Sequence, residues 1–420
     1  SFAGDFKYSS IGHTFTKMLS GYLPALAENG NTTSYIPNKV AIDLTLDNTQ
    51  EISRILGIPY EIEGQSTIKG DINETSNKVE LLVRVDALKT EKQIFENISV
   101  RLENIADKIQ LTGRTQMHDQ KADMLNIFLS AEALKDIVNA KLIWQNNEDV
   151  TNAGEVSTQT SLFKKDKSIQ AHTILQPSQV IISDSVWNIR KSDVYFHSDS
   201  LISINNFLFE NERQFIHIDG KASKSQQDSL IVSTNDLNLD YIMQLLRLRG
   251  IKFGGSITGK LKLFSLLKEP IFLGNLDVKN FSLNDKIIAD AVVSSTWDKI
   301  NSRLLINGDF TNKKQEVVAK ATGIFVPRND SLDLKVDARK FPLEFLNRYF
   351  EGVASDFNGD AAGILRIFGP TKTLLFEGDM AVTDGRASID MLNTTYRFSN
   401  KVKLTTHRIH LNNIRLSDEE

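Results

Sequence analysis

The sequence reads FGGSITGKLKL at residues 253–263 and FNGDAAGILRI at residues 357–367, so the second stretch repeats the pattern of the first at an offset of 104 residues (357 − 253 = 104). The offset holds without gaps between residues 237–278 and 341–382. A chain copied at such a spacing is typical of an array of supersecondary units, each burying its apolar face only against its neighbours. The repeat therefore argues against a single closed globular enzyme.

Fainter copies of a strand, a glycine, a turn and a second strand lie elsewhere in the chain. Residues 218–230 and 321–332 share this pattern, with an offset of 103 at the glycine (323 − 220) and 102 at the aspartate (330 − 228). Weaker versions occur at residues 111–125 and 40–46. We expect repeat units at residues 1–120, 121–235, 236–339 and 340–420. Because no Pro-, Ser- or Gly-rich linker separates them, we expect a continuous rod-like body without hinged domains.

Alternation of apolar and polar residues with a period of two dominates the chain, and this is typical of strands with one apolar face. The predicted fold is mainly β: an elongated, repeat-built antiparallel sheet with a few short helices. We expect helices at residues 239–246 and 342–350 from an apolar stripe and a proline in the first turn, and near residues 49–57 from a capping box. A weaker helix is expected at residues 131–139.

Composition limits the classes of function. The net charge is −4, with 49 basic and 53 acidic residues and no basic block, so nucleic acid is not expected as a partner. The chain has no cysteine, which removes disulfides and thiol chemistry and fits an oxidising compartment such as a periplasm. No run approaches the roughly 20 apolar residues that cross a bilayer. We expect a segment of a longer protein, with any membrane anchor outside it.

Two motifs imitate chemistry. Residues 254–261 come within one residue of a phosphate-binding loop, but Leu261 stands where the motif needs Ser or Thr, and the second copy lacks the lysine. Gly255 and Gly259 there permit either sharp bends and close backbone approach or a turn only. His407 and His410 point to opposite faces of a strand, so they cannot share a metal ion. We predict no catalytic residues, no metal and no cofactor.

The apolar alternation itself is the remaining candidate for function. Trp187 is expected to pack in the core. The other apolar residues lie either in the dry core of a closed sandwich or on the concave face of a trough that stays partly open and takes an apolar ligand. The candidate lipid-groove residues are Ile257, Leu261, Leu263, Phe272, Leu276, Val278, Leu365, Ile367, Leu374, Phe376, Met380 and Val382.

The C-terminal part of the sequence supports a family resemblance. Residues 357–370, 375–378 and 385–387 resemble the region just before the C-terminal domain of TamB-like proteins, which are anchored in the inner membrane, belong to the bacterial translocation and assembly module, and are related to AsmA-like proteins. Residues 395–398 and 414–420 are similar to the opening of that domain. Residues 186–220 are similar to repeated strand units upstream. The resemblance covers the chain from about residue 170 onward.

The resemblance implies a fold class for the chain, an elongated antiparallel β-groove that is also called β-taco-like, and it places this groove in the periplasm between the inner and outer membranes. Its work would be phospholipid transport, outer-membrane protein assembly and secretion, or both. Its partners would be phospholipid or other acyl chains and an outer-membrane barrel protein of the BamA/TamA type, contacted mostly through regions outside this segment. The family offers no catalytic residues to carry over.

Three hypotheses follow. The first is a non-enzymatic lipid conduit with an apolar groove. The second is a structural scaffold or chaperone-like arm that guides outer-membrane proteins by strand pairing without carrying lipid. The third is an enzyme on a β-solenoid, for which the sequence shows no cluster of carboxylates or basic residues over successive turns.

Overall fold

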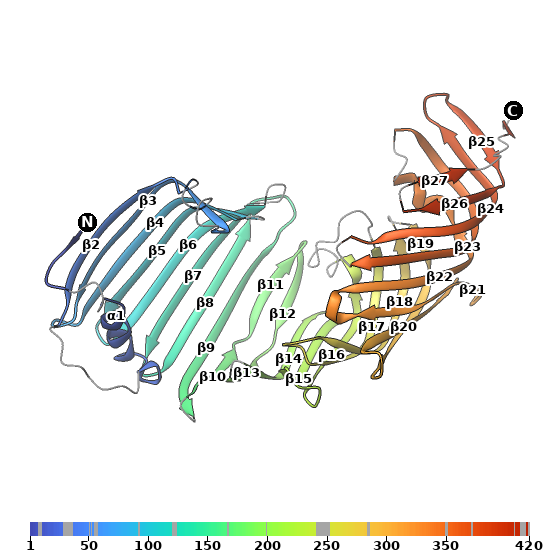
Figure 1. Cartoon of the computed structure of the whole chain (residues 1–420). Helices are drawn as coiled ribbons and strands as arrows, with labels where there is room; N and C mark the ends of the chain where they lie inside the picture. Colours follow the sequence, from blue (N-terminus) through green and yellow to red (C-terminus); the bar gives the residue numbers. More distant parts are fainter. Residues whose placement is uncertain are drawn as a thin grey trace. The chain divides into compact units, whose positions relative to one another are not determined.

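The computed structural model describes residues 1–6, 11–27, 37–49, 51, 53, 58–90, 93–119, 124–165, 168–198, 200–240, 253–283, 286–348, 352–370, 373–406, 408–411 and 417–418. The chain is 74% strand and 6% helix, so the predicted mainly β, antiparallel fold with few short helices is confirmed (Figure 1). Its contacts form two compact units, an N-terminal unit of Ser1–Asn211 and a C-terminal unit of Glu212–Glu420. The predicted four-unit division stays a prediction, and its boundaries at 235/236 and 339/340 fall within strands.

The N-terminal unit is a sheet accompanied by helix α1 and the 3-10 turn η2, and Glu51 and Ser53 are also helical. Its elements are β1 (Phe2–Ala3), α1 (Ile11–Ser20), η2 (Pro24–Leu26), β2 (Lys39–Asp47), β3 (Tyr60–Asn73), β4 (Lys78–Thr90), β5 (Gln93–Ile105), β6 (Lys108–Asp119), β7 (Leu125–Leu134), β8 (Ile137–Asn146), β9 (Ala153–Lys165), β10 (Ser168–Leu175), β11 (Ser178–Ile182), β12 (Ser185–Ile189), β13 (Ser192–Ser198) and β14 (Leu201–Asn211).

Strands β1 to β9 of this unit pair antiparallel in chain order. Strand β9 then pairs with both β10 and β11, and β14 pairs with both β12 and β13. Residues 176–177 and 190–191 interrupt what would otherwise be two long strands. Pro177 has no N–H to give to the ladder, which explains the first interruption.

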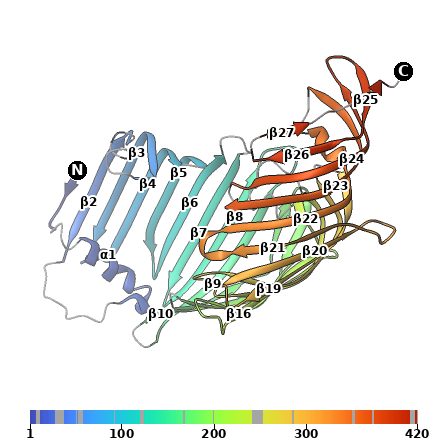
Figure 2. The same cartoon turned by 45° about the vertical axis from the view of Figure 1, so that its right-hand side comes forward.

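The C-terminal unit is also an antiparallel sheet, curled across its strands (Figure 2). Its elements are β15 (Gln214–Ser223), β16 (Ser229–Asn238), β17 (Phe253–Phe264), β18 (Ile271–Leu283), β19 (Lys286–Asp298), β20 (Arg303–Thr311), β21 (Val317–Val326), η3 (Pro327–Asn329), β22 (Ser331–Pro342), η4 (Leu343–Arg348), β23 (Ala354–Pro370), β24 (Leu375–Ile389), β25 (Thr394–Phe398), β26 (Lys401–Thr405), β27 (Arg408–Leu411) and β28 (Ser417–Asp418). Strands β15 to β24 pair in chain order, and β24 pairs with both β25 and β26.

The repeat predicted from sequence is present in the pairing register. In the first copy Gly259 pairs with Leu276, and in the second Gly363 pairs with Met380, at the same offset of 104. The glycine φ angles also agree, at 156° and 151°. Leu239 and Leu343 both begin a helical segment directly after a strand, although most of the first segment lies outside the described residues.

Two helix predictions have other outcomes. The helix expected at residues 131–139 is wrong, because β7 and β8 form a hairpin there. Lys135 and Asp136 both have positive φ, 49° and 64°, as a two-residue hairpin turn requires. Of the helix expected near residues 49–57, Glu51 and Ser53 are helical, and residues 50, 52 and 54–57 lie outside the described part.

Helix α1 was not predicted, although its signal is in the sequence. Phe15, Met18, Leu19 and Tyr22 fall at i, i+3, i+4 and i+7, the spacing of one apolar helix stripe. Among the described residues, none of the helices has the length and apolar character that a membrane span needs.

Candidate functional site

The strand register of the C-terminal unit gathers apolar side chains on one face of the sheet. Residues that pair directly across antiparallel strands point to the same face, so each ladder can be followed from strand to strand. We call the resulting surface the C-terminal apolar face. It comprises residues 230, 232, 234 and 237 of β16, 257, 259, 261 and 263 of β17, 272, 274, 276 and 278 of β18, 291, 293, 295 and 297 of β19, 304, 306, 308 and 310 of β20, 319, 321, 323 and 325 of β21, 332, 334, 336 and 338 of β22, 361, 363, 365, 367 and 369 of β23, 376, 378, 380 and 382 of β24, and 402 and 404 of β26.

None of these residues carries a charge, and only Thr234 and Ser295 are polar. The Ser295 hydroxyl donates to the Phe272 carbonyl at 2.8 Å, so its hydrogen-bonding capacity is used locally. A face assembled from many strands without one ionised group has no charge to desolvate when an apolar molecule lies on it.

Eleven of the twelve predicted groove residues belong to this face, and Leu374 precedes β24 outside the paired ladder. Equivalent residues of the two sequence copies do not lie in the same row of cross-strand pairs. Leu261 leads from strand to strand to Ile367 and Phe376, whereas its sequence equivalent is Leu365, so the ladder shifts by two residues per repeat.

The C-terminal apolar face is partly open. Phe272 is 38% exposed, and Leu261, Leu276, Leu365 and Phe376 are half-buried. In a closed sandwich such large side chains would be sealed from water. Burial is concentrated at one end of the strands, where Leu343 of η4 packs on Ala361 and Val382.

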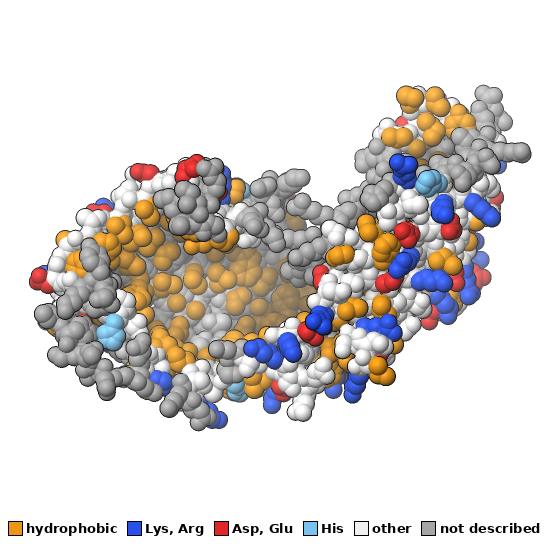
Figure 3. Space-filling view, in the orientation of Figure 1, with side chains coloured by type: hydrophobic (Ala, Val, Ile, Leu, Met, Phe, Trp, Pro, Cys, Tyr) orange, Lys and Arg blue, Asp and Glu red, His pale blue; other side chains and the backbone are white. Residues whose placement is uncertain are grey.

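The opposite face of the same sheet is charged. Arg366 donates two hydrogen bonds to Asp333, at 2.8 and 2.9 Å, and Lys320 lies 3.1 Å from Asp309. The Arg366 guanidinium lowers the pKa of the Asp333 carboxyl by hydrogen bonding to its ionised form. Figure 3 shows Lys, Arg, Asp and Glu gathered on the visible surface of this unit.

The N-terminal unit has a second uncharged face, which the sequence reading did not assign as a site. We call it the N-terminal apolar face. Its ladder comprises residues 40, 42, 44 and 46 of β2, 66, 68, 70 and 72 of β3, 79, 81, 83 and 85 of β4, 98, 100, 102 and 104 of β5, 109, 111, 113, 115 and 117 of β6, 125, 127, 129, 131 and 133 of β7, 138, 140, 142, 144 and 146 of β8, and 154, 156, 158 and 160 of β9. Its polar members, among them Asn104 and Asn146, are uncharged.

In Figure 3 this surface is hollowed and crowded with hydrophobic side chains. The period-two runs at residues 40–46, 79–85 and 125–133 are the signal that could have identified it. Farther along the sheet, Trp187 is 1% exposed and its ring lies 4.8 Å from that of Phe209, so the prediction that it packs in the core is confirmed.

The phosphate-loop imitation is part of a strand. Residues 254–261 lie within β17, which is paired on both sides, so they form no loop before a helix. Gly255 and Gly259 are within the strand rather than in a turn, and close backbone approach accounts for them. His410 is in β27, and His407 lies outside the described residues.

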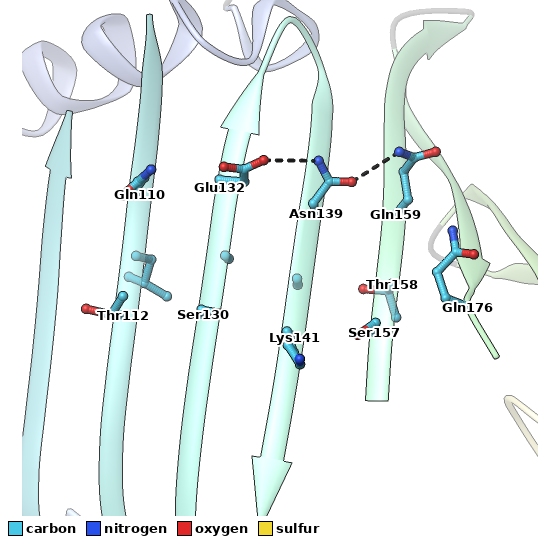
Figure 4. Close-up of a pocket in the computed structure, with 13 residues that line it drawn as sticks. Gln110, Thr112, Ser130, Glu132, Asn139, Lys141, Ser157, Thr158, Gln159 and Gln176 are labelled. Carbon is cyan, nitrogen blue, oxygen red and sulfur yellow. Dashed lines mark hydrogen bonds between the residues drawn. The ribbon is translucent and has the colours of Figure 1, made fainter. Parts of the chain in front are cut away.

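A polar depression of about 400 Å³ lies on the other side of the N-terminal sheet (Figure 4). Asn139 hydrogen-bonds to Glu132 on one side and to Gln159 on the other, at 3.5 and 3.1 Å. The Lys108 Nζ atom lies 3.1 Å from a carboxylate oxygen of Glu132. These are cross-strand amide and ion pairs on a solvated face, and they leave Glu132 engaged rather than poised as a base.

Within the described ranges, no three His, Cys, Asp or Glu side chains are grouped to hold a metal ion. Compared with known proteins, the chain matches no family model, no curated protein and no solved structure.

Proposed function

We propose that the two apolar faces bind the acyl chains of phospholipid and let them pass, without catalysis. One observation carries the proposal: the strand register assembles faces that are free of charge, dominated by large apolar side chains and half-exposed. Exposed apolar surface of this extent is unusual for a protein whose function does not use it.

The energetics suit movement better than storage. Burying one acyl CH₂ contributes about 0.8 kcal/mol, so about ten methylenes could hold a lipid chain without a charged anchor. Because the ladder presents similar apolar rows on successive strands, neighbouring positions would have similar affinity. A chain held in this way can slide from one row to the next.

The resemblance to TamB-like proteins extends the proposal to the cell. The chain would then be the periplasmic part of a protein anchored in the inner membrane of a diderm bacterium. It would support phospholipid transport and outer-membrane biogenesis together with a barrel protein of the outer membrane.

A charge placed on the apolar face tests the proposal. In the intact protein, Phe376→Arg should reduce the phospholipid that co-purifies, measured by mass spectrometry of organic extracts. Leu375→Arg is the matched control, because it makes the same change on the adjacent residue, which points to the charged face. Unchanged lipid in a folded Phe376→Arg protein would count against the conduit and favour a scaffold that pairs strands with client proteins.

A further inference from the structure

Helix α1 and the turn η2 lie on the N-terminal apolar face and cover one end of its strands. Met18 packs on Ile72 and Val79, and Tyr22 packs on Ile109 and Ala133. All four sheet residues belong to the face defined above. The helix therefore occupies surface that would otherwise be available to an acyl chain.

Hydrogen bonds fix one side of the helix to the turn between β3 and β4. Lys17 lies 2.6 Å from Glu74, whose side chain is only 7% exposed. The backbone N–H of Asn38 donates to Glu74 at 3.1 Å, and the Asn38 amide donates to the Thr14 hydroxyl at 2.6 Å. If the helix moved away, the Glu74 carboxylate would lose its lysine partner while still largely buried, and a buried charge without its partner is costly, which favours a fixed helix.

The segment after the helix is fixed to the turn between β7 and β8. The backbone N–H of Ala25 donates to the Asp136 carboxylate at 2.7 Å, and the Asp136 N–H donates to the Tyr22 carbonyl at 3.1 Å. The Asn77 amide donates to the Tyr22 hydroxyl at 3.2 Å. The α1–η2 segment thus spans several hairpins and is attached at both ends.

Coverage by the helix separates a buried row of the face, which we call the covered row, from rows farther along the strands that stay partly exposed. In the covered row Val40, Ile72, Val79, Ile109 and Ala133 are all buried, with Val40 1% exposed. Four residues along the same strand as Val40, Leu44 is half-buried, and Leu46 is 45% exposed. On β8, Leu142 is 39% exposed, which shows the same gradient away from the helix.

An unbroken row of directly paired residues lies beyond the helix, and we call it the open row. It consists of Leu44, Ile68, Val83, Val100, Gly113, Leu129, Leu142 and Val156. Each member is apolar, and each comes from the next strand along the sheet. Since neighbouring strands are about 4.8 Å apart, five of them span about 19 Å, enough for a long acyl chain lying across the strands.

We propose that α1 is a fixed wall, and that the open row is the acyl-chain path of the N-terminal unit. This inference rests on the proposed function and names the part of the site that the ligand takes. The covered row is closed to lipid, so a chain crosses the strands along the open row and does not enter beneath the helix.

A diazirine-bearing fatty acid and the matching phospholipid, photolysed with the wild-type protein, test the inference by peptide mapping. Carbene insertion is expected on peptides at Val83, Leu129 and Leu142 and absent at Ile72 and Val79. Equal insertion in the covered row would overturn the fixed wall. Insertion confined to the C-terminal unit would overturn the N-terminal path while leaving the proposed function standing, whereas insertion nowhere on either apolar face would refute the proposed function itself.

A second arm uses a released helix. Glu74→Ala combined with Asp136→Ala removes the two carboxylates that accept hydrogen bonds from Lys17 and from the Asn38 and Ala25 N–H groups. Circular dichroism checks that the sheet persists, and hydrogen exchange of α1 checks that the helix is released. Labelling should then extend to Ile72 and Val79 by at least several-fold. A folded double variant in which α1 exchanges rapidly but the labelling pattern stays that of the wild type would contradict the assignment of α1 as the barrier.

Discussion

Glycine occupies positions on the apolar faces where two strands come too close for a Cβ atom. A Cβ at Gly259 would lie 2.3 Å from the Asn275 carbonyl oxygen, and one at Gly363 would lie 2.1 Å from that of Asp379. Both residues also have a positive φ that L side chains rarely adopt. The missing side chains relieve crowding on the inner side of a curled sheet.

Substitution at these glycines should be costly. Gly363→Ala is expected to lower the free energy of unfolding by about 1–3 kcal/mol, from strained backbone and a backbone clash. Gly308→Ala is the control on the same face, because its nearest neighbour is the edge of the Phe310 ring at 3.3 Å, which can shift. Denaturant unfolding followed by circular dichroism compares the two, and an equal effect would contradict close approach as the reason for Gly363.

Asp333 and Arg366 give a pH prediction on the charged face. Hydrogen bonding to Arg366 lowers the folded-state pKa of Asp333. The stability that the pair contributes is therefore present above the unfolded pKa of about 3.9 and is lost as the pH falls through the folded value. NMR titration should find the Asp333 pKa below 3.9 in the wild type and closer to it in Arg366→Gln. If Asp333 had the same pKa in both proteins, Arg366 would not be the cause of the lowered pKa.

At the scale of elements, hairpins and one helix shape the faces. Period-two alternation predicted the mainly β fold, and it predicted the shared face of eleven C-terminal residues because a strand has only two faces. The Ala131–Asn139 stretch favours a helix by its two alanines and one leucine, whereas the positive φ angles of Lys135 and Asp136 form the turn of a hairpin. The apolar stripe of α1 was overlooked because its burial depends on the distant strands β3, β4, β6 and β7.

Helix α1 should contribute to stability through packing rather than helix propensity. Met18 is 5% exposed and packs on Ile72 and Val79. Met18→Ala should therefore lower the free energy of unfolding by about 2–5 kcal/mol. Thr16→Ala is the control, because it also places an alanine in α1 but at a less buried position. Alanine has a higher helix propensity than threonine, so this change should not weaken the helix itself. Amide hydrogen exchange in β3 and β4 should become faster in Met18→Ala and stay unchanged in Thr16→Ala. Faster exchange in both variants would contradict packing of Met18 as the source of the stability.

At the scale of the whole molecule, the candidate site could be predicted only in part. The sequence repeat identified eleven residues that share the C-terminal apolar face, but not the two-residue shift between copies. That shift follows from the pairing registers of the strands from β17 to β23, which the hairpin connections between them set. The strands of the N-terminal apolar face show apolar alternation in the sequence, but they lack the gapless repeat that marks the strands of the C-terminal apolar face.

An uncharged binding surface predicts a particular thermodynamic pattern. Affinity for fatty acids should rise about fourfold for each added methylene, since each contributes about 0.8 kcal/mol. It should change less than about twofold between roughly 0.05 and 0.5 M salt, because no protein charge on the face is there to be screened. Fluorescent fatty-acid titrations measure both. A steep loss of affinity with salt would instead assign binding to the charged face.

The most direct measurement of the central claim is photo-crosslinking from the protein in living cells. A photoreactive amino acid at Leu276 places the probe on the C-terminal apolar face, and the same residue at Asp277 places it on the opposite face of the same strand. Phospholipid should be captured from position 276 and not from position 277. Equal capture from both positions, or capture from neither while the protein is folded and abundant, would contradict the assignment of the apolar face as the lipid path.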